Sequence, residues 1–313
     1  MGSGTQKTAM THANHGMPAN GARITMFSGK GGVGKTTCSA ATALHYAACG
    51  ERTLAISTDA TPSLSHIFEL GDGAKPKRVT DSLYVNELGA EEVKVMWDEK
   101  FGKDVYDVFS SFVSIDYPEF VDFTTNILPG LRDEFMVDYI RELCLGGDYH
   151  SIVWDTAPLG QTLALLHTPA MLLDHLRMAP KIYTRLKLSN ISKEPILDII
   201  GRWGKLSATE MDFLRGCVKF VLVTIPEALA VEQLEGAFGD FDRHGLKVEQ
   251  LIVNNVIRAD DSEFLRAKAS QQRKYLDIIH TRYPDLQIVE VPMFPYELTG
   301  WERLKEVERI LFP

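Results

Sequence analysis

One glycine-rich segment near the start of the chain constrains the fold more than any other feature. Residues 29–37 read GKGGVGKTT and fit the pattern G-x-x-x-x-G-K-[ST], with a second lysine, Lys30, directly after the first glycine. A β-type run at 23–28 precedes the segment, and an alanine-rich run at 38–48 follows it. In a strand–loop–helix context, successive backbone N–H groups and the helix N-terminus together hold an anion. The segment therefore predicts a site for a nucleoside triphosphate.

Single residues in and after this loop predict the chemistry of the site. Lys35 is expected to reach the β- and γ-phosphates, and the Thr36 hydroxyl to ligate Mg²⁺. Asp59 follows a β-type run at 53–58 and is placed to orient the attacking water, the alternative being an acidic helix cap. Asp155 ends another apolar run, as expected of an acid that holds the Mg²⁺ shell. Asn254 ends a later run and carries an amide able to read a purine edge.

Short apolar runs recur along the chain with helix-length segments between them. Such runs favour a mostly parallel sheet covered on both faces, whose ligands bind where the strands end. We therefore predict an α/β fold, a doubly wound, mostly parallel sheet of the phosphate-loop NTPase type. The predicted strands are 23–28, 53–58, 151–155, 219–224, 250–254 and 287–291.

Two stretches, about 91–145 and 178–216, interrupt this rhythm and predict an inserted α-helical subdomain. In the first, apolar residues follow the spacing of one helix face, and a second helix is expected after residues 128–130. That face has two interpretations, a core of its own or a groove for a hydrophobic helix. The residues of the face are Phe101, Val105, Val108, Phe109 and Phe112.

Composition narrows the class of protein. The 313 residues carry a formal net charge of −9 and no basic tract, so a nucleic-acid partner is not expected. We find no membrane-spanning apolar run and no signal-peptide pattern, and the four cysteines are scattered, which favours a reducing, cytoplasmic location. Residues 1–21 read as a disordered leader, and 22–313 as the ATPase domain with its helical inserts.

Several ordered motifs together resemble one family. The loop at 29–37, the run STD ending at Asp59, and DTAPLGQTL from Asp155 are similar to the ArsA/Get family. That family contains arsenite-pump ATPases and the cytosolic ATPases that target tail-anchored membrane proteins. The resemblance implies a homodimer that uses ATP/ADP and Mg²⁺, binds hydrophobic transmembrane segments of client proteins and meets a membrane receptor.

The resemblance also implies roles for single residues. Lys30 matches a lysine that crosses the dimer interface to the partner's phosphates, and Glu227 a glutamate that contacts nucleotide from the opposing subunit. Asn254 matches the residue that reads adenine. With Asp59, Lys30 and Lys35 as catalytic residues and Thr36 and Asp155 as metal ligands, the implied nucleotide-binding set is Gly29, Lys30, Gly31, Gly32, Val33, Gly34, Lys35, Thr36, Thr37, Glu227, Asn254, Pro292, Met293 and Phe294.

The chain departs from the family pattern in residues that differ between the targeting relatives and the pump relatives. Targeting relatives often carry a zinc-binding C-x-x-C, but residues 261–266 read DSEFLR, so no zinc is expected. Pump relatives hold arsenite with three thiolates in a duplicated chain, whereas Cys144 and Cys217 of this single-copy chain lack an evident third partner. The sequence therefore favours a dimeric, Mg²⁺-dependent ATPase that opens and closes a hydrophobic groove for tail-anchored clients. The alternative is the energising ATPase of an arsenite or anion efflux pump.

Overall fold

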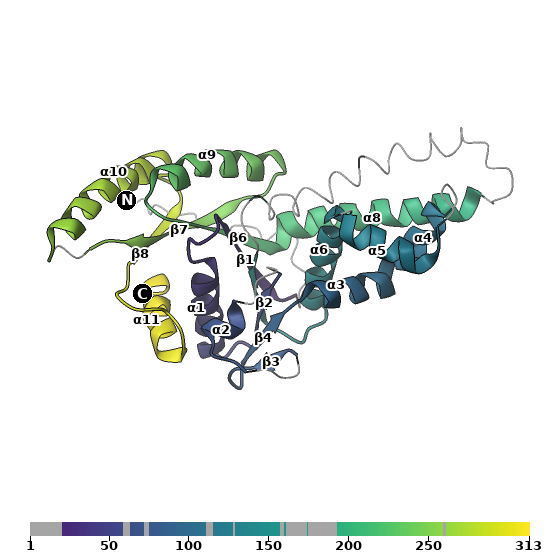
Figure 1. Cartoon of the computed structure of the whole chain (residues 1–313), viewed down its shortest axis with the longest axis horizontal. Coiled ribbons are helices and arrows are strands. Elements are labelled where there is room, and N and C mark those ends of the chain that lie inside the picture. Colours follow the sequence, from purple (N-terminus) through teal and green to yellow (C-terminus); the bar gives the residue numbers. More distant parts are fainter. Residues whose placement is uncertain are drawn as a thin grey trace, which may run out of the picture.

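The fold is built around one eight-stranded sheet (Figure 1). The computed structural model describes residues 21–58, 63–71, 75–110, 115–127, 129–156, 160, 174, 193–258 and 261–313. The strand order is β3-β4-β2-β5-β1-β6-β7-β8, and every pair is parallel except β3 with β4. The strands are β1 (Arg23–Gly29), β2 (Thr53–Ser57), β3 (Lys77–Arg78), β4 (Leu83–Glu87), β5 (Ser151–Asp155), β6 (Val218–Thr224), β7 (Val248–Val256) and β8 (Gln287–Pro292).

Both faces of the sheet are buried, which explains the continuous apolar runs. Because side chains alternate along a strand, Ile24 and Met26 of β1 enter one core and Phe27 enters the other. The Phe27 face is covered by α1 (Lys35–Ala48), α2 (Leu64–Ile67) and α11 (Trp301–Leu311). The opposite face carries α9 (Ala228–Arg243), α10 (Glu263–Arg282) and a separate layer of helices.

That layer lies to one side of the sheet and corresponds to the predicted inserts (Figure 1). It consists of α3 (Ala90–Trp97), the π-helix η1 (Asp98–Gly102), α4 (Lys103–Phe109), α5 (Tyr117–Ile127), α6 (Pro129–Leu145) and α8 (Lys193–Cys217). The single helix face expected from Phe101 onward is divided between η1 and α4, with Phe101 and Val105 packed against the core. Phe112, residues 178–192 and the side chains of Val108 and Phe109 lie outside the described part.

The predicted strands are present, and the structure corrects two details. Strands β3 and β4 were not predicted, because β3 is only two residues long and the β4 sequence LYVNE mixes polar and apolar residues. Asn254 does not end its strand: β7 continues to Val256 through an irregularity. The last helix, α11, begins at Trp301 and buries Leu304, Val307 and Leu311.

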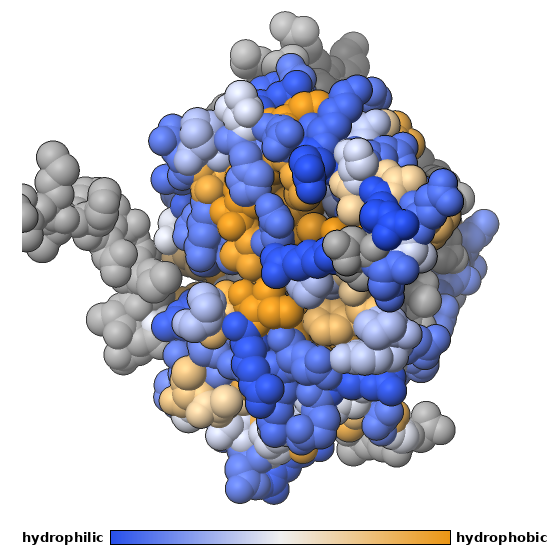
Figure 2. Space-filling view, turned by 90° about the vertical axis from the view of Figure 1, so that its left-hand side faces the viewer, coloured by the Kyte–Doolittle hydropathy of each residue, from blue (hydrophilic) through white to orange (hydrophobic). Residues whose placement is uncertain are grey.

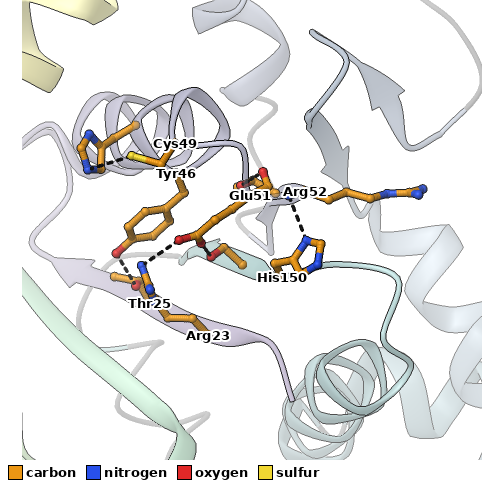
Figure 3. Close-up of polar contacts among 10 residues, drawn as sticks. Arg23, Thr25, Tyr46, Cys49, Glu51, Arg52 and His150 are labelled. Atoms are coloured by element: carbon orange, nitrogen blue, oxygen red, sulfur yellow. Dashed lines mark hydrogen bonds and ion pairs between the residues drawn. The ribbon is translucent and has the colours of Figure 1, made fainter. Parts of the chain in front are cut away.

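The amino ends of the strands carry a compact set of polar contacts (Figure 3). Arg23 Nη1 lies 3.4 Å from Glu51 Oε1, and Ser151 Oγ donates to the same carboxylate. The hydroxyls of Thr25 and Tyr46 are 3.3 Å apart. Side chains from β1, α1 and β5 therefore satisfy one another at this edge, leaving the opposite edge for a ligand.

The outer strand β8 forms an edge of the sheet. Figure 2 shows this side of the molecule, where apolar side chains gather between α10 and α11; Ile288 and Val289 of β8 are half-buried. In the part of the chain that the structure describes, no helix is both long and apolar enough to cross a membrane.

Candidate functional site

The glycine loop lies at the carboxyl end of the central strand β1. This strand pairs with β5 on one side and β6 on the other, and α1 begins at Lys35 directly after the loop. Gly34 is the N-cap of α1 and has no side chain with which to cap the first turn. The first N–H groups of a helix need partners from outside the helix. The loop therefore presents a helix N-terminus to an anion, as the sequence predicts.

Two loop glycines are required by close contacts with neighbouring strands. A Cβ on Gly29 would lie 2.2 Å from the carbonyl oxygen of Val223 in β6. Gly34 has φ +93°, and a Cβ there would lie 2.2 Å from Nδ2 of Asn254 in β7. At Gly29 the clash is with backbone and excludes a side chain, whereas at Gly34 a side chain would have to displace the Asn254 amide in addition to adopting a positive φ. Thus β6 and β7 set the path of the loop.

The two lysines of the loop have different surroundings. Lys35 is buried, and its ammonium group donates to the carbonyl oxygen of Lys30 at 3.3 Å. This bond folds the side chain back over the loop, where an ammonium group can meet phosphate oxygens. Lys30 itself is exposed, as are Gly31 and Gly32. An exposed cation at this position is accessible to a partner or ligand from outside the subunit.

Asp155 brings a buried carboxylate to the same edge of the sheet. It ends β5, in register with Phe27 of β1 and Ser57 of β2, and is 1% exposed. Burial, and after it the charge of Asp155, raises the pKa of the Cys38 thiol in α1 to about 12. Strand β5 packs against α1, with Val153 and Cys38 in one core, so the carboxylate at the end of the strand lies toward the start of the helix. The Thr36 hydroxyl and this carboxylate are the hard oxygen ligands that Mg²⁺ prefers, so the residues fit the ion.

Asp59, the predicted water-orienting acid, lies outside the described residues. The chain leading to it is held at the site, since Thr58 N donates to the Asp155 carbonyl at 3.1 Å. Trp154 Nε1 donates to the Thr58 hydroxyl, also at 3.1 Å. On the other side of Asp155, the Thr156 hydroxyl donates to the Phe27 carbonyl at 2.6 Å. The segment that leads to Asp59 and the segment that follows Asp155 thus begin from the ends of adjacent strands, β2 and β5.

The residues expected around the base lie on β7 and after β8. Met293 N donates to the Val256 carbonyl at 2.9 Å, which ties the segment Pro292–Phe294 to the end of β7. Asn254 is buried and points to the phosphate loop, where Nδ2 donates to the Val33 carbonyl at 2.9 Å. Glu227 is exposed at the N-cap of α9, after β6. The carboxyl ends of β6, β7 and β8 therefore gather these residues along one edge.

Sequence reasoning missed the residues that hold the loop from behind. Val223 of β6 contacts the loop at Gly29 through its backbone carbonyl, and a backbone contact cannot be recognised from residue type. Gln272 of α10 forms hydrogen bonds with the Asn255 carbonyl and with Ile257 N. Gln272 lies eighteen residues after Asn254 in the chain. Nothing in the local pattern of α10 distinguishes Gln272 from Gln271. The adjacent pair Asn254–Asn255 is a signal that could have been used, since asparagine tolerates positive φ.

A phosphate loop after a central parallel strand, with a buried acid on the adjacent strand, defines a phosphate-loop nucleoside triphosphatase. The family described as anion-transporting ATPase matches residues 22–313, and the chain belongs to this family. It is accordingly an ATP-hydrolysing enzyme with the ArsA-type fold.

Most of the chain aligns with relatives of two kinds, some named as GET3 ATPases and others as arsenical pump-driving ATPases. It is 30% identical over 311 residues to ATPase GET3 of Kluyveromyces lactis, covering 90% of this chain and 87% of the relative. It is 29% identical over 296 residues to ATPase GET3A of Arabidopsis thaliana, covering 88% and 80%. It is 29% identical over 301 residues to "Putative arsenical pump-driving ATPase 2" of Aquifex aeolicus (strain VF5), covering 92% and 99%. The names alone do not choose between the two branches.

Proposed function

We propose that this ATPase is a Mg²⁺-dependent homodimer that opens and closes a hydrophobic groove for tail-anchored membrane protein clients. In this proposal the phosphate loop and Asn254 hold ATP, Thr36 and Asp155 hold Mg²⁺, and Asp59 orients the attacking water. Lys30 and Glu227 act across the dimer. Residues Pro292–Phe294 border the base. The client and dimer follow from the resemblance of the motifs, and the helical layer is where the clients bind.

The contact that carries this proposal is made by Glu87, at the end of β4. Its Oε1 accepts a hydrogen bond of 2.7 Å from the N–H of Leu64, the first residue of α2, which follows the Asp59 segment. Three residues beyond Glu87, α3 begins the helical layer. Lys75 reinforces the junction, since its ammonium group donates to the Glu87 carbonyl and to Glu92 of α3. A change in the Asp59 segment therefore has a direct mechanical path into the helical layer.

The helical layer also offers apolar surface. Val95 of α3 is 55% exposed, although its helix neighbours Val93 and Trp97 are buried. The faces of α3 and α4 that pack inward form the layer's core, so the client surface is expected on residues such as Val95 that remain outside it. The inward faces agree with a core, and the groove interpretation adds to it the exposed apolar residues of the layer.

Client capture tests the proposal. The full-length protein is mixed with a soluble fusion of a hydrophobic transmembrane segment, with ATP, with ADP and without nucleotide, and the captured fraction is measured. We expect capture that depends on nucleotide and falls at least about fivefold in Val95→Asp, since the charge would have to be buried. Leu145→Asp is the matched control, because Leu145 is 52% exposed at the far end of α6. Equal loss in both variants, or no capture by the wild type, would contradict the proposal.

The catalytic assignment has its own test. Asp59→Asn should leave ATP binding within about twofold and abolish turnover, because the amide cannot accept a proton from water. Unchanged turnover would remove Asp59 from this role without affecting the client proposal.

The second candidate is the energising ATPase of an arsenite or anion pump. One observation favours it: Cys144 and Cys217 are buried in the same core. Burial, and after it the neighbouring Cys217, raises the pKa of Cys144. Arsenite-stimulated ATP hydrolysis that is lost in Cys144→Ser, together with no client capture, would support this function instead.

A further inference from the structure

Strand β7 contains a bulge next to the phosphate loop. Val253 pairs with Glu290 and Val256 with Pro292, so two residues of β7, Asn254 and Asn255, oppose one residue of β8. Asn255 has φ +58°, which places it in the left-handed region. A bulge changes the direction in which a strand presents its side chains. Here the change begins at Asn255: Asn254 still points to the face of Ile252, where it meets the loop, although β7 and the loop are more than 200 residues apart in sequence.

Gln272 of α10 holds both sides of this bulge. Its Nε2 donates to the Asn255 carbonyl at 3.0 Å, and its Oε1 accepts from Ile257 N at 2.8 Å. A bulge leaves backbone groups without ladder partners. One primary amide supplies the donor and the acceptor that the strand lacks at this point. Gln272 therefore stabilises the left-handed residue and, through it, the direction of Asn254.

Asn254 in turn holds the phosphate loop. Its amide is buried and donates to the Val33 carbonyl at 2.9 Å. The same nitrogen occupies the space in which a Cβ of Gly34 would lie. The carbonyl of Val33 is thereby turned toward β7, so the neighbouring peptide N–H groups of the loop are free to point the other way. A loop whose N–H groups already point at the anion binds phosphate with less ordering cost.

We propose that Gln272 is a positioning residue of the phosphate loop, acting through the bulge and Asn254. Asn254 then has a role in phosphate affinity that is independent of the base. Helix α10 is coupled to the loop by this chain of three contacts, so a movement of α10 changes nucleotide affinity. The inference rests on phosphate binding at residues 29–37 and not on the proposed clients.

Ligands with and without adenine distinguish a role of Asn254 in phosphate binding from a role in contacting the base. The affinities of wild type and Asn254→Ala for ATP, GTP and inorganic tripolyphosphate are measured by competition against a fluorescent ATP analogue. We expect a loss of about tenfold for all three probes, the typical effect of one hydrogen bond in a buried site. A loss for ATP alone, with tripolyphosphate unchanged, would make Asn254 a base reader only and overturn the proposal.

Gln272 has a matched control in the next residue of the helix. Gln272→Ala should weaken all three probes by about three- to tenfold, whereas Gln271→Ala should not, because Gln271 is exposed. Gln272→Glu keeps the acceptor for Ile257 N and loses the donor. Its affinities for the three probes should therefore lie between those of Gln272→Ala and wild type. In the double variant with Asn254→Ala, removing Gln272 should add little, because both residues act on one path.

Hydrogen–deuterium exchange provides a measurement that needs no ligand. In the nucleotide-free protein, amide exchange in the peptide spanning 29–37 should be faster in Gln272→Ala than in wild type or Gln271→Ala. The melting temperature of each variant shows whether the whole fold is affected. Loop exchange that is the same in both glutamine variants would show that Gln272 only supports α10.

Discussion

The two ends of helix α1 mark two edges of the sheet that are built in opposite ways. At the carboxyl edge, Gly34 and the first turn of α1 lie against backbone and amide groups of β6 and β7. At the amino edge, where α1 ends, charged and hydroxyl side chains pair with one another (Figure 3). The first edge presents a helix N-terminus and a buried acid, and at the second edge side chains pair with one another. The proposed binding edge therefore differs in construction from the edge that only stabilises the sheet.

The largest expected difference between the two ends is in thiol reactivity. Cys38 lies near the start of α1 with its pKa raised to about 12, and Cys49 is exposed at the end of the helix. At pH 9 about one Cys38 thiol in a thousand is ionised, and the thiolate is the reactive form. Iodoacetamide should therefore modify Cys49 at least about 1000-fold faster than Cys38, as measured by peptide mass spectrometry. Comparable rates would show that the carboxyl edge is open to solvent.

The next largest expected effect is on ATP affinity. It compares substitutions at two glycines that have similar φ angles. Gly34→Ala places a Cβ against Asn254 at φ +93°, whereas Gly50→Ala adds one at φ +85° with no atom within 4 Å. Each substitution carries strain of roughly 1–3 kcal/mol, but only the first distorts the loop. We expect ATP affinity to fall at least about 100-fold in Gly34→Ala and to change less than about twofold in Gly50→Ala. Equal affinity losses, measured by titration calorimetry, would remove the distinction.

The smallest effect concerns the ion pair at the amino edge. Arg23 is 50% and Glu51 27% exposed, so solvent screens their attraction. A double-mutant cycle with Arg23→Met and Glu51→Gln should give a coupling below about 1 kcal/mol in urea unfolding. The ATPase rate should stay within about twofold of wild type. A tenfold loss of rate would connect this edge to catalysis and break the comparison.

The sequence alone determined the class of fold and the place of the glycine loop. Residues 29–37 carry a local pattern that predicts a loop between a strand and a helix, and the continuous apolar runs indicate that both faces of the sheet are buried. The helical inserts followed from the change in period at about residue 91. These features are local, because each depends on residues within one or two turns or strands, and local preferences can be read along the chain.

Only the tertiary structure decided what surrounds the loop. The sequence predicted that Asn254 ends its strand; in the fold β7 continues past it through a bulge, and its amide donates to the Val33 carbonyl. Gln272, Val223 and Glu87 act through contacts with segments distant in sequence, and their residue types are ordinary. Strand order places β6 beside β1 and β7 beside β6, and hydrogen bonds between backbone groups leave no trace in residue identity. The sequence thus determines the class of fold and the glycine loop at residues 29–37, and tertiary packing determines how that loop is held.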